Sequence, residues 1–218
     1  MITRSRFVST LTLAVLVLAV PALARAAADP KAAEKVAQGM VKFDQSIATA
    51  STQIESTLTA MNALTQPGAN LVDAYKNFTK QVDALGKVAD KAKANSQKAT
   101  QQRDQYLKQW QESQAGIQNA QLKAASEARR AELMPKIEAI KGSLTSASTT
   151  FKPFHQDLKD LTVFLANALN PAGIASANEL MTKCNTDGAS VKADLAKASA
   201  AVKDLAGSIQ PGNPAPPK

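Results

Sequence analysis

Residues 151–180 read FKPFHQDLKDLTVFLANALNPAGIASANEL. This stretch contains the densest apolar stripe of the sequence after the first 28 residues. The stripe comprises Phe151, Phe154, Leu158, Leu161, Phe164, Leu165 and Leu169. A strong turn signal, Asn170-Pro171-Ala172-Gly173, follows it, and a proline is well tolerated in the first turn of a helix. The pattern predicts that two long helices meet at this turn.

The rest of the sequence repeats the same apolar spacing. Apolar or small residues recur in alternating steps of four and three along four segments, which is typical of the seam of a coiled coil. Only 4% of the residues are aromatic, which fits long helices around a narrow core. The predicted helices span about residues 32–64, 71–113, 118–169 and 172–209. Because short turns join them, we expect an all-α fold, an elongated antiparallel four-helix coiled-coil bundle with a long central hairpin, over residues 29–210.

Turn signals separate the predicted helices. Pro67 cannot continue a helical hydrogen-bond ladder, and Gly68 tolerates the backbone conformation that follows a helix end. Asn70 is expected to cap the second helix together with Asp73. Around Gly116 the seam slips by one residue, so the second helix is expected to end there.

Two prolines lie inside the third predicted helix. Pro135 and Pro153 each remove one backbone donor and crowd a carbonyl of the preceding turn. The apolar spacing continues across both, so we expect them to kink the helix rather than end it. If either ends the helix, the Ser- and Thr-rich residues 143–150 favour Pro153.

The central hairpin offers a candidate contact surface. The first and fourth helices are shorter than the other two, so the end near Gly116 is expected to project as a two-helix hairpin. The candidate partner contacts on its seam are Tyr106, Trp110 and Ile117. The seam positions of Tyr106 and Trp110 favour core packing, and the pair becomes a binding anchor only if the tip is unpaired. Small or polar residues fill the seam over residues 89–103, where packing must be close and thin, or partly wet.

The first 28 residues resemble an export signal. Arg4 and Arg6 precede an apolar run at residues 11–20, and small-residue cleavage sites follow it. The run is short for a bilayer span, so a cleaved signal is favoured over a retained anchor. We therefore expect a periplasmic or secreted protein. Residues 211–218 are rich in proline and are expected to form a disordered tail.

The sequence offers little catalytic chemistry. It has a single histidine, His155, and a single cysteine, Cys184, so no internal disulfide can form and no metal-ligand spacing occurs. We expect no enzyme activity, no cofactor and no metal site. His155 is expected to be structural or on the surface. Cys184 lies on a seam, which favours a small buried residue over a redox-active or intermolecular thiol.

The basic residues are scattered along the chain. The formal charge is +8, from 26 basic and 18 acidic residues, and no block of like charge occurs. This distribution favours a solvated helical surface, with weak contact to anionic envelope polymers or a lipid surface as the alternative. A basic cluster with interleaved aromatics is absent from the sequence, so nucleic acid is not expected as a partner.

Residues 151–176 also carry a family resemblance. Lys152-Pro153-Phe154, Leu161-Thr162-Val163-Phe164-Leu165 and Asn170-Pro171-Ala172-Gly173 resemble the signature passage of the bacterial family called domain of unknown function 2959. The resemblance implies an exported chain with an early helix carrying an aromatic near Phe43, followed by a long charged hairpin. This sequence departs from the family in its Ala-rich, less acidic hairpin. The resemblance implies no catalytic residues.

Two functions from different classes fit these observations. The favoured hypothesis is a non-enzymatic spacer or adaptor of the bacterial envelope that binds an envelope protein through its helix faces. The alternative is a carrier or holdase chaperone for lipids or unfolded exported proteins, because a thin seam at residues 89–103 could open and expose apolar surface. Self-association into a homo-oligomer is open in both cases.

Overall fold

Four long α-helices make up the fold. The computed structural model describes residues 30–209, and this part of the chain contains no strand. The helices are α1 (Pro30–Asn62), α2 (Leu71–Ala115), α3 (Ala120–Asn167) and α4 (Pro171–Ile209), with a short 3-10 helix, η2 (Ala63–Thr65), after α1. The all-α prediction is confirmed.

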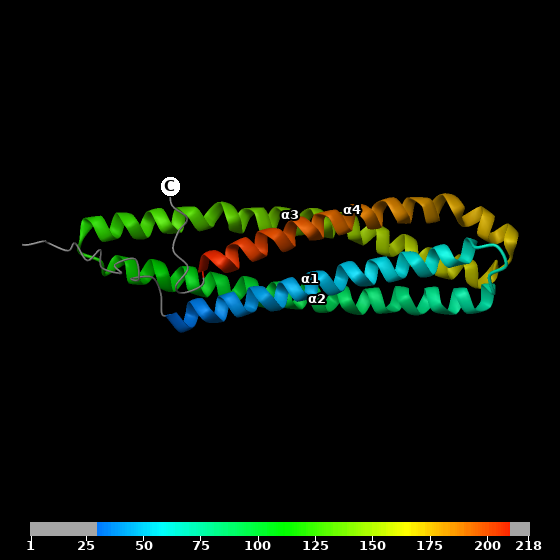
Figure 1. Ribbon diagram of the computed structural model, residues 1–218, viewed down its shortest axis with the longest axis horizontal. Coiled ribbons are helices and arrows are strands. Elements are labelled where there is room, and N and C mark those ends of the chain that lie inside the picture. The colour runs from blue at the N-terminus through cyan, green and yellow to red at the C-terminus, as the bar shows by residue number, and fades with distance from the viewer. Residues whose placement is uncertain (1–29, 210–218) are drawn as a thin grey trace, which may run out of the picture.

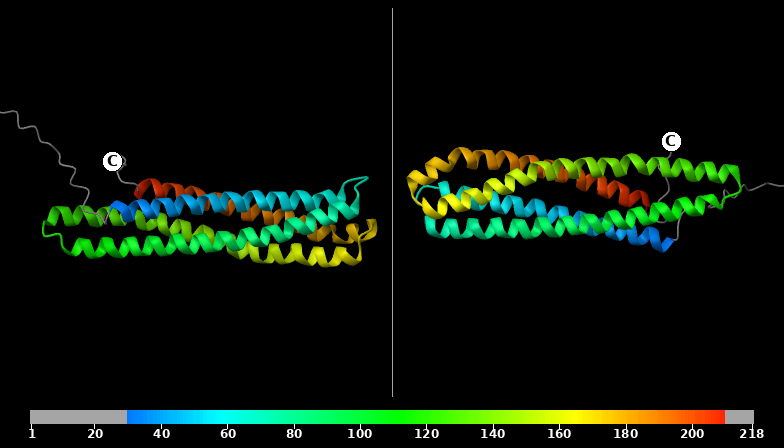
Figure 2. Two further views of the ribbon diagram at one scale, coloured as in Figure 1. Left: turned by 90° about the horizontal axis from the view of Figure 1, so that it is seen from below. Right: turned by 180° about the vertical axis from the view of Figure 1, so that it is seen from behind.

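The helices run up and down along one axis. Figure 1 shows α1 beside α2 and α3 beside α4, with the α1–α2 and α3–α4 connections at one end of the rod and the α2–α3 turn at the other. The two further views show the same elongated shape (Figure 2). The hairpin of α2 and α3 extends past the start of α1 and the end of α4, as the sequence predicts (Figure 1).

The seams predicted from the four-three spacing form the core. Phe43 and Met61 in α1 are buried, as are Phe154 in α3 and Leu205 in α4. The buried side chains form two clusters, one toward the α2–α3 turn and one toward the two connections at the opposite end. Two positions at helix ends depart from the predicted four-three spacing. The spacing put Thr65 and Ser113 on the seams, but both are exposed, and Leu64 and Gln114 are buried instead. At the first of these positions the chain tightens into η2.

Asparagines begin two of the helices. The Asn70 side chain accepts hydrogen bonds from the backbone N–H groups of Val72 and Asp73, as predicted for an N-cap. Asn119 caps α3 in the same way, through the N–H groups of Gln121 and Leu122. These caps satisfy backbone donors that a helix leaves unpaired at its start.

The helices also end where the sequence predicts that they end. Gly68 adopts a φ of 75°, which only glycine reaches without strain, and Gly116 follows the last residue of α2. Pro135 and Pro153 lie inside α3, which continues through both. Neither proline ends the helix, in agreement with the unbroken apolar spacing.

None of the helices within residues 30–209 has a stretch long and apolar enough to cross a membrane. The predicted export signal at residues 1–28 and the predicted tail at residues 211–218 lie outside the described residues.

Candidate functional site

Tyr106 and Trp110 lie in the four-helix part of the bundle. They are 5% and 2% exposed, with ring centroids 5.7 Å apart in an edge-on arrangement. The indole Nε1 of Trp110 donates a hydrogen bond to the hydroxyl of Ser126 at 2.8 Å, which joins α2 to α3. Burial raises the pKa of the Tyr106 hydroxyl above its ordinary value. The prediction of core packing is confirmed for this pair.

The alternative prediction, that Tyr106 and Trp110 are exposed and anchor a binding partner, is wrong. Both belong to one buried cluster with residues from the start of α1, such as Val36, and the end of α4, such as Leu205 and Ile209. The ends of these two shorter helices cover the aromatic pair. The projecting part of the hairpin begins beyond it, so neither ring offers surface to a partner.

Ile117 is the candidate contact that does lie at the projecting turn, where it is half-buried. The surrounding tip is polar. Gln114 is buried beside the turn, and its side-chain Nε2 has no hydrogen-bond partner within the described chain. Because the large exposed apolar side chains found in the described residues all lie outside the tip, an apolar partner has little to bind there.

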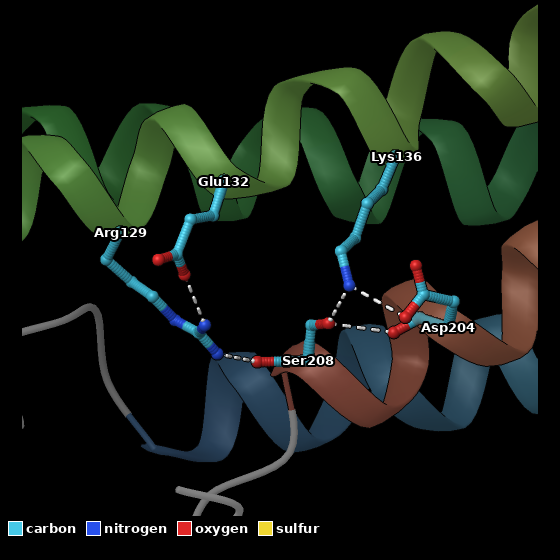
Figure 3. A network of polar contacts seen from close by, with 5 residues as sticks. All are labelled: Arg129, Glu132, Lys136, Asp204 and Ser208. Atoms are coloured by element: carbon cyan, nitrogen blue, oxygen red, sulfur yellow. Dashed lines mark hydrogen bonds and ion pairs between the residues drawn. The ribbon is translucent and has the colours of Figure 1, made fainter. Parts of the chain in front are cut away.

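A polar network fixes the base of the projecting hairpin (Figure 3). The Arg129 guanidinium donates to the backbone carbonyl of Ser208 and pairs with Glu132 at 2.8 Å. The Lys136 ammonium group contacts a carboxylate oxygen of Asp204 at 2.7 Å and the Ser208 hydroxyl at 2.8 Å. The last carbonyls of a helix lack partners within it, so the Arg129 bond to the Ser208 carbonyl stabilises the final turn of α4. Lys136 ties the same turn to α3 through side-chain oxygens. The network was not anticipated from the sequence.

The opposite end of the rod exposes apolar side chains. Val163 is 66% exposed, Val72 52% and Phe164 44%. The Tyr75 hydroxyl donates to the Thr162 carbonyl at 2.9 Å, which brings the start of α2 to the end of α3. We call Val72, Val163 and Phe164 the loop-end patch. The sequence interpretation placed Phe164 in the apolar stripe and did not single out this patch.

A groove lies at the same end of the bundle. It encloses about 550 Å³ and is lined by the α1–α2 connection, including Leu64 and Pro67, and by the first turns of α4, including Pro171 and Ile174. Gly173, at the bottom of the α3–α4 turn, is buried. The turn that carries the family resemblance therefore shapes one wall of this groove.

Cys184 is fully buried in α4. Burial raises the pKa of its thiol to about 12, and nearby Asp157 adds to this shift. The thiolate is the reactive form of cysteine, so burial and the raised pKa both disfavour reaction of this thiol in the folded protein. The prediction of a small buried residue is confirmed, and the folded chain gives no support to a redox or intermolecular role.

We expect Cys184 to react with a thiol reagent only when the chain unfolds. The modification rate at about pH 8 should be negligible without denaturant and should rise in parallel with the loss of helicity in urea, because both measure global unfolding. Labelling with a maleimide, followed by mass spectrometry, measures this rate. Rapid labelling of the native protein would show that α4 opens locally around Cys184.

His155 is held between α3 and α2. Its ring stacks on Phe151 with centroids 5.3 Å apart, and a side-chain carbon at Gly86 of α2 would lie 3.4 Å from the imidazole. Its Nε2 atom is buried without a hydrogen-bond partner among the described residues. Burial, assisted by the charge of Lys159, lowers the pKa of His155, and Asp90 opposes the shift. The predicted structural role is consistent with this position.

The lowered pKa of His155 predicts a pH-dependent stability. The unfolded chain takes up a proton near pH 6.5 while the folded chain does not, so stability is complete above about pH 6.5 and falls as the pH drops toward the lower folded-state pKa. Urea midpoints at about pH 7.5 and pH 5.5 measure the effect. His155→Gln should remove this part of the slope. Equal slopes for the variant and the natural chain would refute the assignment.

Within residues 30–209, no three His, Cys, Asp or Glu side chains come close enough together to hold a metal ion. The described chain also contains ion pairs at its surface, such as Lys183 with Asp157 and Asp187. These pairs link adjacent helices or adjacent turns and do not converge on a cavity.

Comparison with known families places the chain. The family described as Protein of unknown function (DUF2959) matches residues 32–206. The chain belongs to the DUF2959 family. In this DUF2959 protein the match covers the bundle from the first turns of α1 to the last turns of α4, so the family corresponds to the whole four-helix fold. No curated protein and no solved structure matches the chain.

Proposed function

We propose that this protein is a non-enzymatic spacer or adaptor of the bacterial envelope that binds a protein partner at the loop end of its rod. The observation that carries the proposal is the loop-end patch, where Val72, Val163 and Phe164 expose large apolar side chains. The groove of about 550 Å³ at the same end adds a concave surface. Exposed apolar side chains and a groove at the same end of the rod suit an apolar helix or segment of another protein.

The location in the envelope rests on the sequence alone. Arg4, Arg6 and the apolar residues 11–20 support export, followed by cleavage before the bundle. Mass spectrometry of the protein isolated from cell fractions tests this part separately. A mature N-terminus near Asp29 in the periplasmic fraction or the medium supports it, and an uncleaved cytoplasmic chain would contradict it.

The carrier or holdase alternative receives less support. It depended on a thin seam at residues 89–103 that could open and expose apolar surface. In this region Ala99 is buried, and the neighbouring groove between α1 and α2 is lined mainly by Lys, Gln and Asn side chains. Polar walls do not shelter lipids or unfolded apolar segments.

Site-specific cross-linking in intact cells tests the adaptor role. A photo-reactive residue at Val163 should capture one protein in stoichiometric amounts, and Phe164→Ser should abolish the capture without changing the melting temperature, because Phe164 is exposed. The same probe at Gln121 in the polar tip is the matched control and should capture nothing specific. Capture of lipid or of many unrelated exported chains from position 163 would favour the carrier instead.

A further inference from the structure

A second concave surface lies between α1 and α2, far from the loop-end patch. It encloses about 520 Å³. Three of its lining residues are lysines, Lys35 and Lys42 from α1 and Lys98 from α2, and none is acidic. All three lysines are exposed, and none of them forms an ion pair within residues 30–209. The groove therefore has a positive charge that the described chain leaves unneutralised.

The lysines have a defined spacing. Lys35 and Lys42 are two helical turns apart on α1, which is about 10 Å along the axis. The Asn95 side chain donates to the Ser46 hydroxyl at 2.6 Å, and Gln102 lies against Gly39. These two contacts set α1 and α2 in register on either side of Lys42 and Lys98, so the two lysines face each other across the groove. The packing of α1 against α2 therefore fixes the backbone positions of the three lysines around the groove.

Amide side chains make up most of the remaining wall. They belong to Gln38, Asn95, Gln101, Gln102 and Gln105. Two of them form side-chain hydrogen bonds: Asn95 donates to the Ser46 hydroxyl, and Gln38 donates to the Glu34 carboxylate at 3.2 Å. An amide both donates and accepts hydrogen bonds, so it pairs well with hydroxyl groups.

Gln102 points to the kind of ligand. Its Oε1 atom is buried and has no hydrogen-bond partner within the described residues. It occupies the space above Gly39, where a side-chain carbon would come within 2.1 Å of it. An unpaired acceptor carbonyl gains from a donor such as a hydroxyl, which a sulfate dianion cannot supply. Gln102 also lines the groove, so a ligand bound there brings its donors next to this side chain.

From these features we propose that the α1–α2 groove binds an acidic saccharide. Lys35, Lys42 and Lys98 pair with its anionic groups, and the amides, Gln102 foremost, bind its hydroxyls. The proposal goes beyond the adaptor function and does not depend on the loop-end patch, so Phe164→Ser should leave saccharide binding unchanged.

Calorimetric titration of the purified protein with trigalacturonic acid tests the proposal. We expect saturable binding at low salt that weakens as salt is added, and no binding of the neutral maltotriose, because the lysines supply much of the attraction. The double variant Lys42→Gln/Lys98→Gln should weaken binding by about tenfold or more. The matched control is Lys76→Gln/Lys80→Gln, which removes two exposed lysines elsewhere on α2 that form no ion pair within residues 30–209, and it should change the affinity by less than about twofold.

Two further comparisons distinguish the binding of a saccharide from the binding of a simple inorganic anion. Gln102→Met should weaken the binding of trigalacturonic acid and leave that of inorganic sulfate, which has no hydrogen-bond donor, unchanged. If Lys42→Gln/Lys98→Gln and Lys76→Gln/Lys80→Gln weakened the binding of trigalacturonic acid equally, the α1–α2 groove would not be the binding site. Sulfate binding as tight as that of the trisaccharide, or binding of maltotriose at equal strength, would overturn the assignment of an acidic saccharide.

Discussion

Replacing Trp110 with alanine should lower the free energy of unfolding by about 3–5 kcal/mol, the usual cost of removing a large buried aromatic side chain. Trp110 is 2% exposed and is held to Ser126 by its indole hydrogen bond. The substitution leaves a cavity where the ends of α1 and α4 close over the hairpin. Urea unfolding followed by circular dichroism measures the loss, since the variant lacks the one tryptophan of the chain.

Two milder variants divide the contribution of Trp110 into packing and hydrogen bonding. Trp110→Phe keeps most of the apolar contact and should cost about 1–2 kcal/mol, and Ser126→Ala, which removes only the acceptor, should cost about 1 kcal/mol. If Trp110→Ala left stability unchanged, the side chain would not be a core residue. The exposed-anchor alternative would then return.

The burial of Trp110 marks a limit of sequence reasoning for this fold. The four-three spacing within each segment predicted which face of each helix is buried, because that face depends only on positions along one helix. Whether α1 and α4 reach Trp110 depends on how far the helices slide along one another. That offset comes from contacts between helices, such as Arg129 with Ser208, which no single periodicity encodes.

Phe164 shows a different limit. It was counted in the apolar stripe, yet Leu161 and Leu165 occupy the seam and are buried, while Phe164, one position earlier than Leu165, faces outward and is 44% exposed. Neighbouring residues on a helix point about 100° apart, so the strict spacing already separates Phe164 from the core. The seam could therefore have identified the loop-end patch.

For the thin seam at residues 89–103, the sequence predicted either close packing or partial hydration. The structure has a closely packed position and a polar groove side by side. Ala99 is buried at the interface, and beside it the polar groove holds the Lys98 ammonium group and the Gln102 amide. Small seam residues cannot fill the space between two helix axes, so long polar side chains from the flanks cover it.

Gly173→Ala should destabilise the protein by about 2–3 kcal/mol, the range for forcing extra atoms into a packed site. A Cβ atom at Gly173 would lie 1.9 Å from the backbone oxygen of Ala168 and 2.9 Å from its carbonyl carbon. Backbone atoms cannot rotate away as a side chain can. The Ala168 oxygen also accepts a hydrogen bond from the Asn170 N–H at 2.9 Å, so relief of the clash would disrupt the α3–α4 turn.

The same chemical change at Gly142 provides the control for Gly173→Ala. A Cβ atom at Gly142 meets nothing within 4 Å, so Gly142→Ala should raise stability by up to about 1 kcal/mol through helix propensity alone. Urea midpoints of the two variants should therefore move in opposite directions. Equal shifts would show that the α3–α4 turn relaxes freely. A rigid turn predicts in addition that Gly173→Ala weakens capture from Val163, because the turn holds the end of α3 that carries the loop-end patch.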